Sequence, residues 1–261
     1  MKTRRQVVLL ATALMATVLH TPIVEGQVDQ LAIAQQLLRD NVHGRSRALD
    51  VAAAIDAEKI GSELRAALIT LLERKNRIVE EAARRGEALA NVEDPEFIAG
   101  LSRVVAALRD PQAIGALSKA IYGWITVIRA LAAFGQQAAP SVLSVVTSPE
   151  SHYNAVDHGL ITLRFMVEGA GTRPLLADTL DEIRRAAQQR LTERQQSFTT
   201  VWQAIDLAVV LGDADLRQIV ESFASNRDTV VAAGVEHPEA IDRTQKLAAE
   251  RLAGVPAVPR P

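Results

Sequence analysis

Apolar residues recur every three or four positions along most of the chain, with polar residues between them. The densest example is 101–146, where three apolar segments are divided by Asp110-Pro111 and Gly123, and Gly135 ends the third. This spacing places the apolar side chains on one face of an α-helix, and we find no convincing stretch with the period-two alternation of a half-buried strand. The pattern therefore predicts an all-α fold whose helices are joined by very short turns.

Helix-start and helix-stop residues divide this pattern into segments. Asp94-Pro95 and Asp110-Pro111 each predict a helix start, because Asp caps the first backbone N–H groups and proline is tolerated at the first helical position. Gly135 suits a left-handed helix end. The expected helices span 29–39, 45–54, 59–73, 97–109, 112–121, 124–134, 141–147, 155–167, 174–191, 199–211, 216–224 and 237–253, with a weaker segment at 226–236.

The segment 73–94 differs from its surroundings because it carries charged residues at half of its positions. A thin apolar stripe remains at Ile78, Val79 and Ala82. We expect a solvated helix here, either continuing the preceding one or separate from it, followed by a loop that ends at Asp94.

The same unit, an apolar helix followed by a short turn and another apolar helix, recurs along the chain. Anchoring the turns at Asp56, Asp110, Gly135, Gly169 and Gly212 gives uneven spacings of 54, 25, 34 and 43 residues. A helix pair cannot bury both of its faces alone, so stacked pairs share a continuous core. The sequence thus predicts an α-solenoid of stacked antiparallel helix pairs with about ten helices, and an irregular helical bundle is the alternative.

The segments RVVAALRDPQAIGAL and VIRALAAFGQQAAPSVL resemble HEAT repeats, particularly the short kind related to phycobilisome-lyase repeats. In that family an Asp-Pro turn precedes the second helix, as at Asp110-Pro111. Its Ala- and Leu-rich first helix ends in glycine, with alanine and proline soon after, as in 130–140. The match is weaker over 45–72 and 160–224, and the uneven period departs from the family. The resemblance implies a HEAT-like solenoid that acts as a scaffold.

The first 26 residues have the pattern of a secretory signal peptide. Lys2, Arg4 and Arg5 precede an uncharged run over 7–19, which is too short to span a bilayer. We expect cleavage before Gln27 and export from a bacterial cell, to the periplasm or beyond, with no stable membrane insertion afterwards. An uncleaved anchor or a buried first helix is the alternative. The expected layout is a signal peptide (1–26), a helical-repeat domain (27–253) and a disordered proline-rich tail (254–261).

The composition of the chain excludes several classes of function. Hydrophobic residues make up 48% of the chain but aromatic residues only 3%, which suits helices built from alanine and leucine. The net charge of -2 offers no basic excess to neutralise phosphates, so a nucleic-acid partner is not expected. The sequence contains no cysteine, which excludes disulfides, thiolate nucleophiles and cysteine-ligated metals.

Two groups of residues are candidates for ligand contacts. His152, Asp157 and His158 lie within seven residues, and histidine and carboxylate side chains bind divalent metals. However, the two histidines are six residues apart rather than on one helical face, which favours capping or solvated roles, with His152 at a helix start. The second group is formed by the aromatic residues Tyr122, Trp124 and Tyr153, which would anchor a ligand if exposed and fill the ends of helices if buried.

The sequence contains no glycine-rich phosphate loop, no G-x-S-x-G elbow and no H-E-x-x-H motif, so we predict no catalytic residue and no cofactor. The leading hypothesis is an exported, non-catalytic helical-repeat scaffold or adaptor that binds another protein, whose identity the sequence does not give. One alternative is an envelope metal-binding protein or enzyme that uses 152–168. Another is a binding module for a small molecule or a cell-wall ligand.

Overall fold

The computed structural model describes residues 29–39, 42–85, 87, 94–122, 125–171 and 173–254. The expected signal peptide, Trp124 and the tail after Gly254 lie outside these residues. Every regular element in the described ranges is helical, which confirms the all-α prediction. None of these helices is both long enough and apolar enough to cross a membrane.

Thirteen α-helices occur in the described ranges, more than the ten or so expected of the solenoid but in agreement with the twelve segments and one weaker segment of the helical pattern. The helices are α2 (Gln30–Leu38), α3 (Val42–Ala54), α4 (Ser62–Arg84), α5 (Pro95–Ala107), α6 (Ile114–Lys119), α7 (Ile125–Phe134), α8 (Ala139–Thr147), α9 (Tyr153–Val167), α10 (Ala177–Thr192), α11 (Phe198–Leu211), α12 (Ala214–Ser225), α13 (Arg227–Ala232) and α14 (Pro238–Ala253). Short 3₁₀ turns precede α4, α6 and α8.

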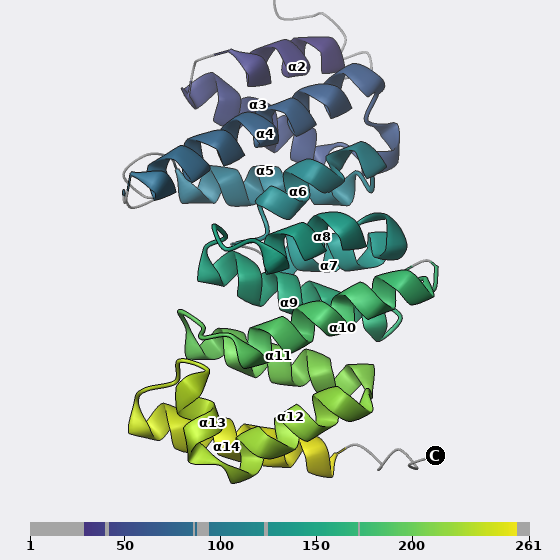
Figure 1. Cartoon of the computed structure of the whole chain (residues 1–261). Helices are drawn as coiled ribbons and strands as arrows, with labels where there is room; N and C mark the ends of the chain where they lie inside the picture. The colour runs from purple at the N-terminus through teal and green to yellow at the C-terminus, as the bar shows by residue number, and fades with distance from the viewer. Residues whose placement is uncertain are drawn as a thin grey trace, which may run out of the picture.

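The helices stack in chain order as two rows (Figure 1). The odd-numbered row consists of α3, α5, α7, α9 and α11, and the even-numbered row consists of α2, α4, α6, α8, α10 and α12. Each helix packs on the next member of its own row and on its sequence neighbour in the other row. This arrangement buries one apolar stripe per helix in a continuous core between the rows.

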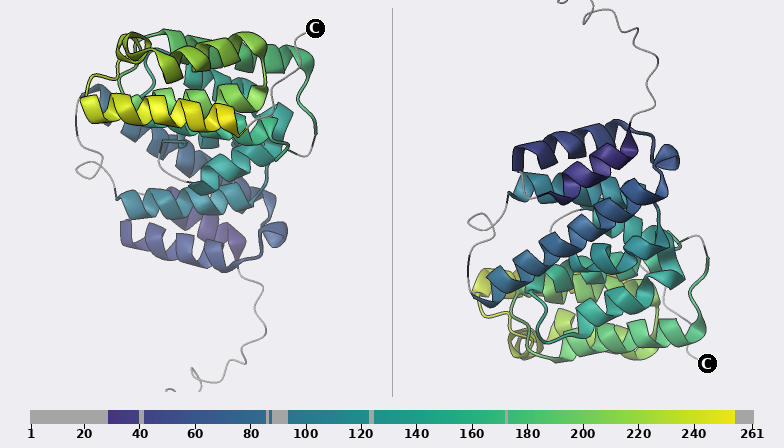
Figure 2. Two further views of the ribbon diagram at one scale, coloured as in Figure 1. Left: turned by 90° about the horizontal axis from the view of Figure 1, so that it is seen from below. Right: turned by 90° about the horizontal axis from the view of Figure 1, so that it is seen from above.

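The two ends of the stack are closed by different helices. Figure 2 views the molecule along the stack and shows α14 across the C-terminal end and α2 at the N-terminal end. α14 packs against both α11 and α12, so it covers the last member of each row.

Several predicted helix ends are present. The Asp94 carboxylate caps α5 by accepting hydrogen bonds from the backbone N–H groups of Glu96 (2.9 Å) and Phe97 (3.4 Å). Gly212 ends α11 in the left-handed conformation, and Asp213 then caps α12. Asp94 and Gly212 act through backbone conformation and local hydrogen bonds, which is why the sequence alone identified these two positions.

The start of α10 differs from the prediction. The helix begins at Ala177 rather than at Pro174, and no side chain of its own segment caps it. Instead, the Leu176 N–H donates to the Gln136 side-chain oxygen at 2.9 Å, and the Gln136 amide donates to the Thr179 hydroxyl at 2.9 Å. A glutamine from the neighbouring turn therefore sets this helix start, which a local pattern does not reveal.

The charged segment after Glu73 continues α4 as one helix of 23 residues. Its first turn is solvated on one side only, because Glu73 and Arg74 are exposed whereas Lys75 and Asn76 are only 4% and 1% exposed. Asn76 extends the apolar stripe of α4 and donates a hydrogen bond to the Ala116 carbonyl at 2.8 Å. The expectation of a solvated helix therefore fails at Lys75 and Asn76, because α6 packs against this side of the helix.

A regular repeat spacing emerges from contacts between helices. Most side-chain hydrogen bonds between helical units join residues 40 to 45 positions apart, from Asn76–Ala116 to Arg251–Asp206. Turn positions gave uneven spacings because turn and helix lengths vary, whereas these bonds compare equivalent places in successive units.

Candidate functional site

The predicted aromatic residues do not form one exposed group in the described structure. Tyr122 follows α6 and is largely buried, and its hydroxyl has no hydrogen-bond partner among the described residues. Burial, and then the nearby charge of Glu80, raise the pKa of Tyr122 to about 12. Tyr153 begins α9 and is 38% exposed, with its ring 4.2 Å from that of His152. Trp124 lies outside the described residues.

The predicted metal-binding residues serve separate contacts. His152 caps α9, accepting from the Asn154 N–H at 3.2 Å, as its expected position at a helix start implied. His158 donates from Nδ1 to the Ile121 carbonyl at 2.7 Å, and buried Asp157 accepts hydrogen bonds from two threonine hydroxyls on α11. Within the described ranges, no three histidine, aspartate or glutamate side chains gather in a way that could hold a metal ion.

A groove between α3 and α5, in the odd-numbered row, is the candidate site. Its volume is about 620 Å³, which lies within the range of about 300–1,000 Å³ usual for ligand sites. The lining residues repeat at helical spacing on both helices, so each helix contributes one face to the groove. They are Ser46, Leu49, Asp50 and Ala53 from α3, and Glu96, Phe97, Gly100, Arg103, Val104 and Ala107 from α5, with the α5 cap Asp94 at one end.

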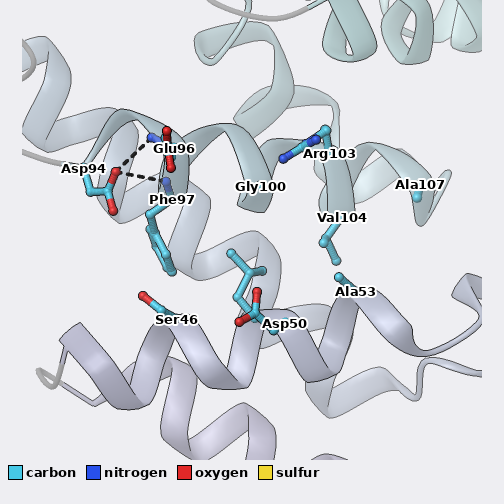
Figure 3. A pocket seen from close by; sticks show the side chains of 11 residues that line it. Ser46, Asp50, Ala53, Asp94, Glu96, Phe97, Gly100, Arg103, Val104 and Ala107 are labelled. Atoms are coloured by element: carbon cyan, nitrogen blue, oxygen red, sulfur yellow. Dashed lines mark hydrogen bonds between the residues drawn. The ribbon is translucent and has the colours of Figure 1, made fainter.

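The groove has an apolar floor. Leu49, Phe97 and Val104 are buried beneath it, and Figure 3 shows Phe97 and Val104 pointing from α5 towards α3. Gly100 lies between them, and a Cβ at this position would be 3.5 Å from the nearest Leu49 methyl carbon. The missing side chain at Gly100 therefore allows the Leu49 side chain of α3 to lie close to α5 at this point.

The position of Phe97 is held from α4. The Lys75 ammonium lies 5.6 Å from the centroid of the Phe97 ring, at a distance where a cation is attracted to an aromatic face. Because Lys75 is buried, this contact is shielded from solvent. The Phe97 ring in the floor of the groove is therefore contacted from α4 as well as by the residues of α3 and α5.

The rim of the groove carries charged side chains that are unpaired within the described part of the chain. The side chains of Asp50, Glu96 and Arg103 are exposed and form no hydrogen bond or ion pair within the described part of the chain. Asp94 uses one carboxylate oxygen to cap α5. The rim thus offers two free carboxylates, a partly used third and one free guanidinium.

A second charged cluster shows the opposite behaviour. The Asp206 carboxylate on α11 receives the Arg164 guanidinium from α9 at 2.8 Å and the Arg251 guanidinium from α14 at 2.6 Å. These charges satisfy one another and join three helices. The Asp206 cluster therefore serves the fold, whereas the charges of the α3–α5 groove remain available.

Sequence reasoning did not identify the groove. Its two walls come from residues about one repeat apart, and Asp50, Glu96 and Arg103 resemble any solvated charges along an amphipathic helix. The one local signal was Gly100, a glycine inside an otherwise strong helical pattern, which often has a packing or functional reason. In comparisons with known proteins, no family model and no curated sequence matches this chain.

Proposed function

We propose that this protein is an exported, non-catalytic helical-repeat adaptor, which binds another protein through the α3–α5 groove. The observation that carries the proposal is a preformed apolar floor beneath charged side chains that have no partner within the described chain. An apolar centre with a polar rim is the usual anatomy of a protein–protein interface.

The architecture supports the same proposal. Stacked helix pairs present an extended surface on which a bound segment meets side chains from successive units. The spacing of 40–45 residues between bonded positions agrees with the period of about 40–47 residues in HEAT repeats. Export rests on the basic and apolar pattern of residues 1–26 alone.

The volume of the groove also suits a small ligand, so a module that binds a small molecule or a cell-wall ligand is the second candidate. The openness of the groove to solvent along two helices favours a peptide segment. A protein partner would be captured as a protein adduct from the exposed Ala53 and Ala107 on the two walls, whereas a small ligand would give no protein adduct.

Photo-crosslinking in the native host tests the proposal. A benzophenone amino acid is placed at Ala53 or Ala107 in the groove, and at Ala249 as a control, an exposed alanine on α14. We expect both groove positions to yield an adduct with the same protein, identified by mass spectrometry, and Ala249 to yield none.

Blocking the groove provides a matched comparison. Gly100→Leu places a side chain in the groove, while Gly115→Leu makes the same change on α6, where an added Cβ meets nothing within 4 Å. The adduct is expected to disappear with Gly100→Leu and persist with Gly115→Leu, provided that both fold as judged by circular dichroism. If Gly100→Leu does not fold, Ala53→Trp obstructs the groove from an exposed position. Equal adducts at all three crosslinking positions, or adducts unaffected by blocking, would overturn the proposal.

A further inference from the structure

The helix at the N-terminal end of the stack has the composition of an interior helix. Among the described helices, only α2 and α8 contain no charged residue. α8 lies inside the even-numbered row and packs against α6 and α10, whereas α2 packs against α4 and has no further described helix of its row beyond it (Figure 1). α2 therefore turns towards solvent a side that the interior helix α8 buries.

The opposite end of the stack is built differently. The outer face of α14 is exposed and carries charged side chains at helical spacing, namely Glu239, Asp242, Arg243, Lys246 and Glu250. A repeat array needs terminal units with polar outer faces to stay soluble as a single chain. α14 meets this requirement and α2 does not, so the α2 end is where a further contact is expected.

The exposed face of α2 is apolar and has the spacing of a seam between two helices. Leu31 is 56% and Leu38 is 36% exposed, and the exposed Gln35 lies between them. Steps of four and three residues align these side chains along one face, as in helices that pack side by side. Val51 of the adjacent α3 is 38% exposed and lies nearly opposite Leu49 on that helix, away from the α3–α5 groove. Two leucines and a valine thus remain exposed at this end.

We infer that this face binds the same face of a second copy of the chain, with the two α2 helices antiparallel about a two-fold axis. A two-fold interface requires a surface that complements itself. Leu31 and Leu38 are equally distant from the middle of α2, between Ala34 and Gln35. Antiparallel pairing about this point sets Leu31 of each copy against Leu38 of the other, and it brings the two Gln35 amides together, where each has both a donor and an acceptor.

The charges that flank α2 fit the same register. Asp29 caps the helix with one carboxylate oxygen, which accepts from the Ala32 N–H at 3.0 Å, and Arg39 follows the last residue of the helix. Both side chains are exposed, and neither forms an ion pair within the described residues. Antiparallel pairing brings Asp29 of each copy towards Arg39 of the other, whereas parallel pairing would place like charges together. This match of α2 with itself favours a second copy as the occupant.

Sedimentation velocity at increasing concentration tests the inference on protein purified after expression of the full chain. We expect a species of two chains. Leu31→Glu places a charge in the apolar seam and should raise the dissociation constant of the dimer at least about tenfold. The matched control is Leu176→Glu, because Leu176 is 62% exposed but precedes α10, and it should leave the dimer unchanged. Circular dichroism checks that both variants fold.

Single cysteines test the register. The chain contains no cysteine, so an introduced one forms a disulfide only with another copy. In the antiparallel seam, the two copies of residue 31 are separated by about 10 Å along the helix axis, beyond the Cα separation of about 7 Å that a disulfide spans. An equal mixture of Leu31→Cys and ¹⁵N-labelled Leu38→Cys should therefore oxidise mainly to the mixed dimer, which mass spectrometry separates from the others.

Three results would overturn the inference: a monomeric wild-type protein at all concentrations, equal dimerisation of Leu31→Glu and Leu176→Glu, or mixed disulfides at no more than the half expected of random pairing. In the first case, N-terminal sequencing would show whether a retained signal peptide is present in place of a second copy. The inference does not rest on the proposed function of the groove. Crosslinks at Ala53 and Ala107 would survive its failure, so the two proposals fail separately.

Discussion

Replacing Asp157 with alanine is expected to destabilise the protein by about 3–6 kcal/mol. The Asp157 carboxylate on α9 is 8% exposed and accepts hydrogen bonds from the hydroxyls of Thr199 and Thr200, where α11 packs against α9. A hydrogen bond to a charged group contributes about 1.5–3 kcal/mol, and the two bonds together give this range. Water cannot replace the lost hydrogen bond at Thr200, because this residue is only 2% exposed and its hydroxyl would be left without an acceptor.

Urea unfolding followed by circular dichroism measures this loss. Asp50→Ala is the matched control, because it removes an exposed aspartate from the middle of α3 and should change the free energy of unfolding by less than about 0.5 kcal/mol. Asp157→Asn keeps one acceptor oxygen and should lose about half as much as Asp157→Ala. A double-mutant cycle with Thr200→Val should show a coupling above about 1 kcal/mol. A loss for Asp157→Ala no larger than that of the control would refute the link between α9 and α11.

Two further outcomes follow from the structure. An added Cβ at Gly171 would lie 2.8 Å from the Gly135 Cα, so Gly171→Ala should lower the free energy of unfolding by about 1–3 kcal/mol. Gly115→Ala, where an added Cβ meets nothing within 4 Å, should raise it by up to about 1 kcal/mol. Calorimetric melting compares the two variants, and an equal effect would contradict the close approach of the turns at Gly135 and Gly171. The raised pKa of Tyr122 means that the folded state keeps its proton up to about pH 12 while the unfolded state releases it near pH 10, so stability should fall by about 2–3 kcal/mol across that window. Unfolding at increasing pH measures this fall, which Tyr122→Phe should largely remove, and an identical pH profile for the two proteins would rule out the buried hydroxyl as its source.

The sequence was sufficient to predict the helices but not how they bond to one another. Asp94-Pro95 and Gly212-Asp213 mark helix ends through local backbone chemistry, and the structure has helix ends at both places. The burial of Lys75 and Asn76 could not be predicted, because a charged run on one helix does not reveal that α6 crosses it. The start of α10 was missed for the same reason, since its cap comes from Gln136.

The candidate site could not be predicted from local sequence patterns. His152 was placed correctly at a helix start because capping is a local property. The aromatic residues were judged from type alone, and type does not distinguish buried Tyr122 from exposed Tyr153. The groove needs two helices brought together at the spacing of one repeat, and that spacing was hidden by turns of unequal length.

The groove is best understood by comparison with the seam that Asp157 closes. Both seams lie between successive helices of the odd-numbered row. Between α9 and α11, Asp157 is bonded to two threonines and Arg164 to Asp206, so the polar groups of the seam satisfy one another. Between α3 and α5, Leu49, Phe97 and Val104 are buried, while Asp50, Glu96 and Arg103 keep their charges free within the described chain. The two seams of the same row therefore differ in that charged groups are paired across the α9–α11 seam and remain exposed beside the α3–α5 seam.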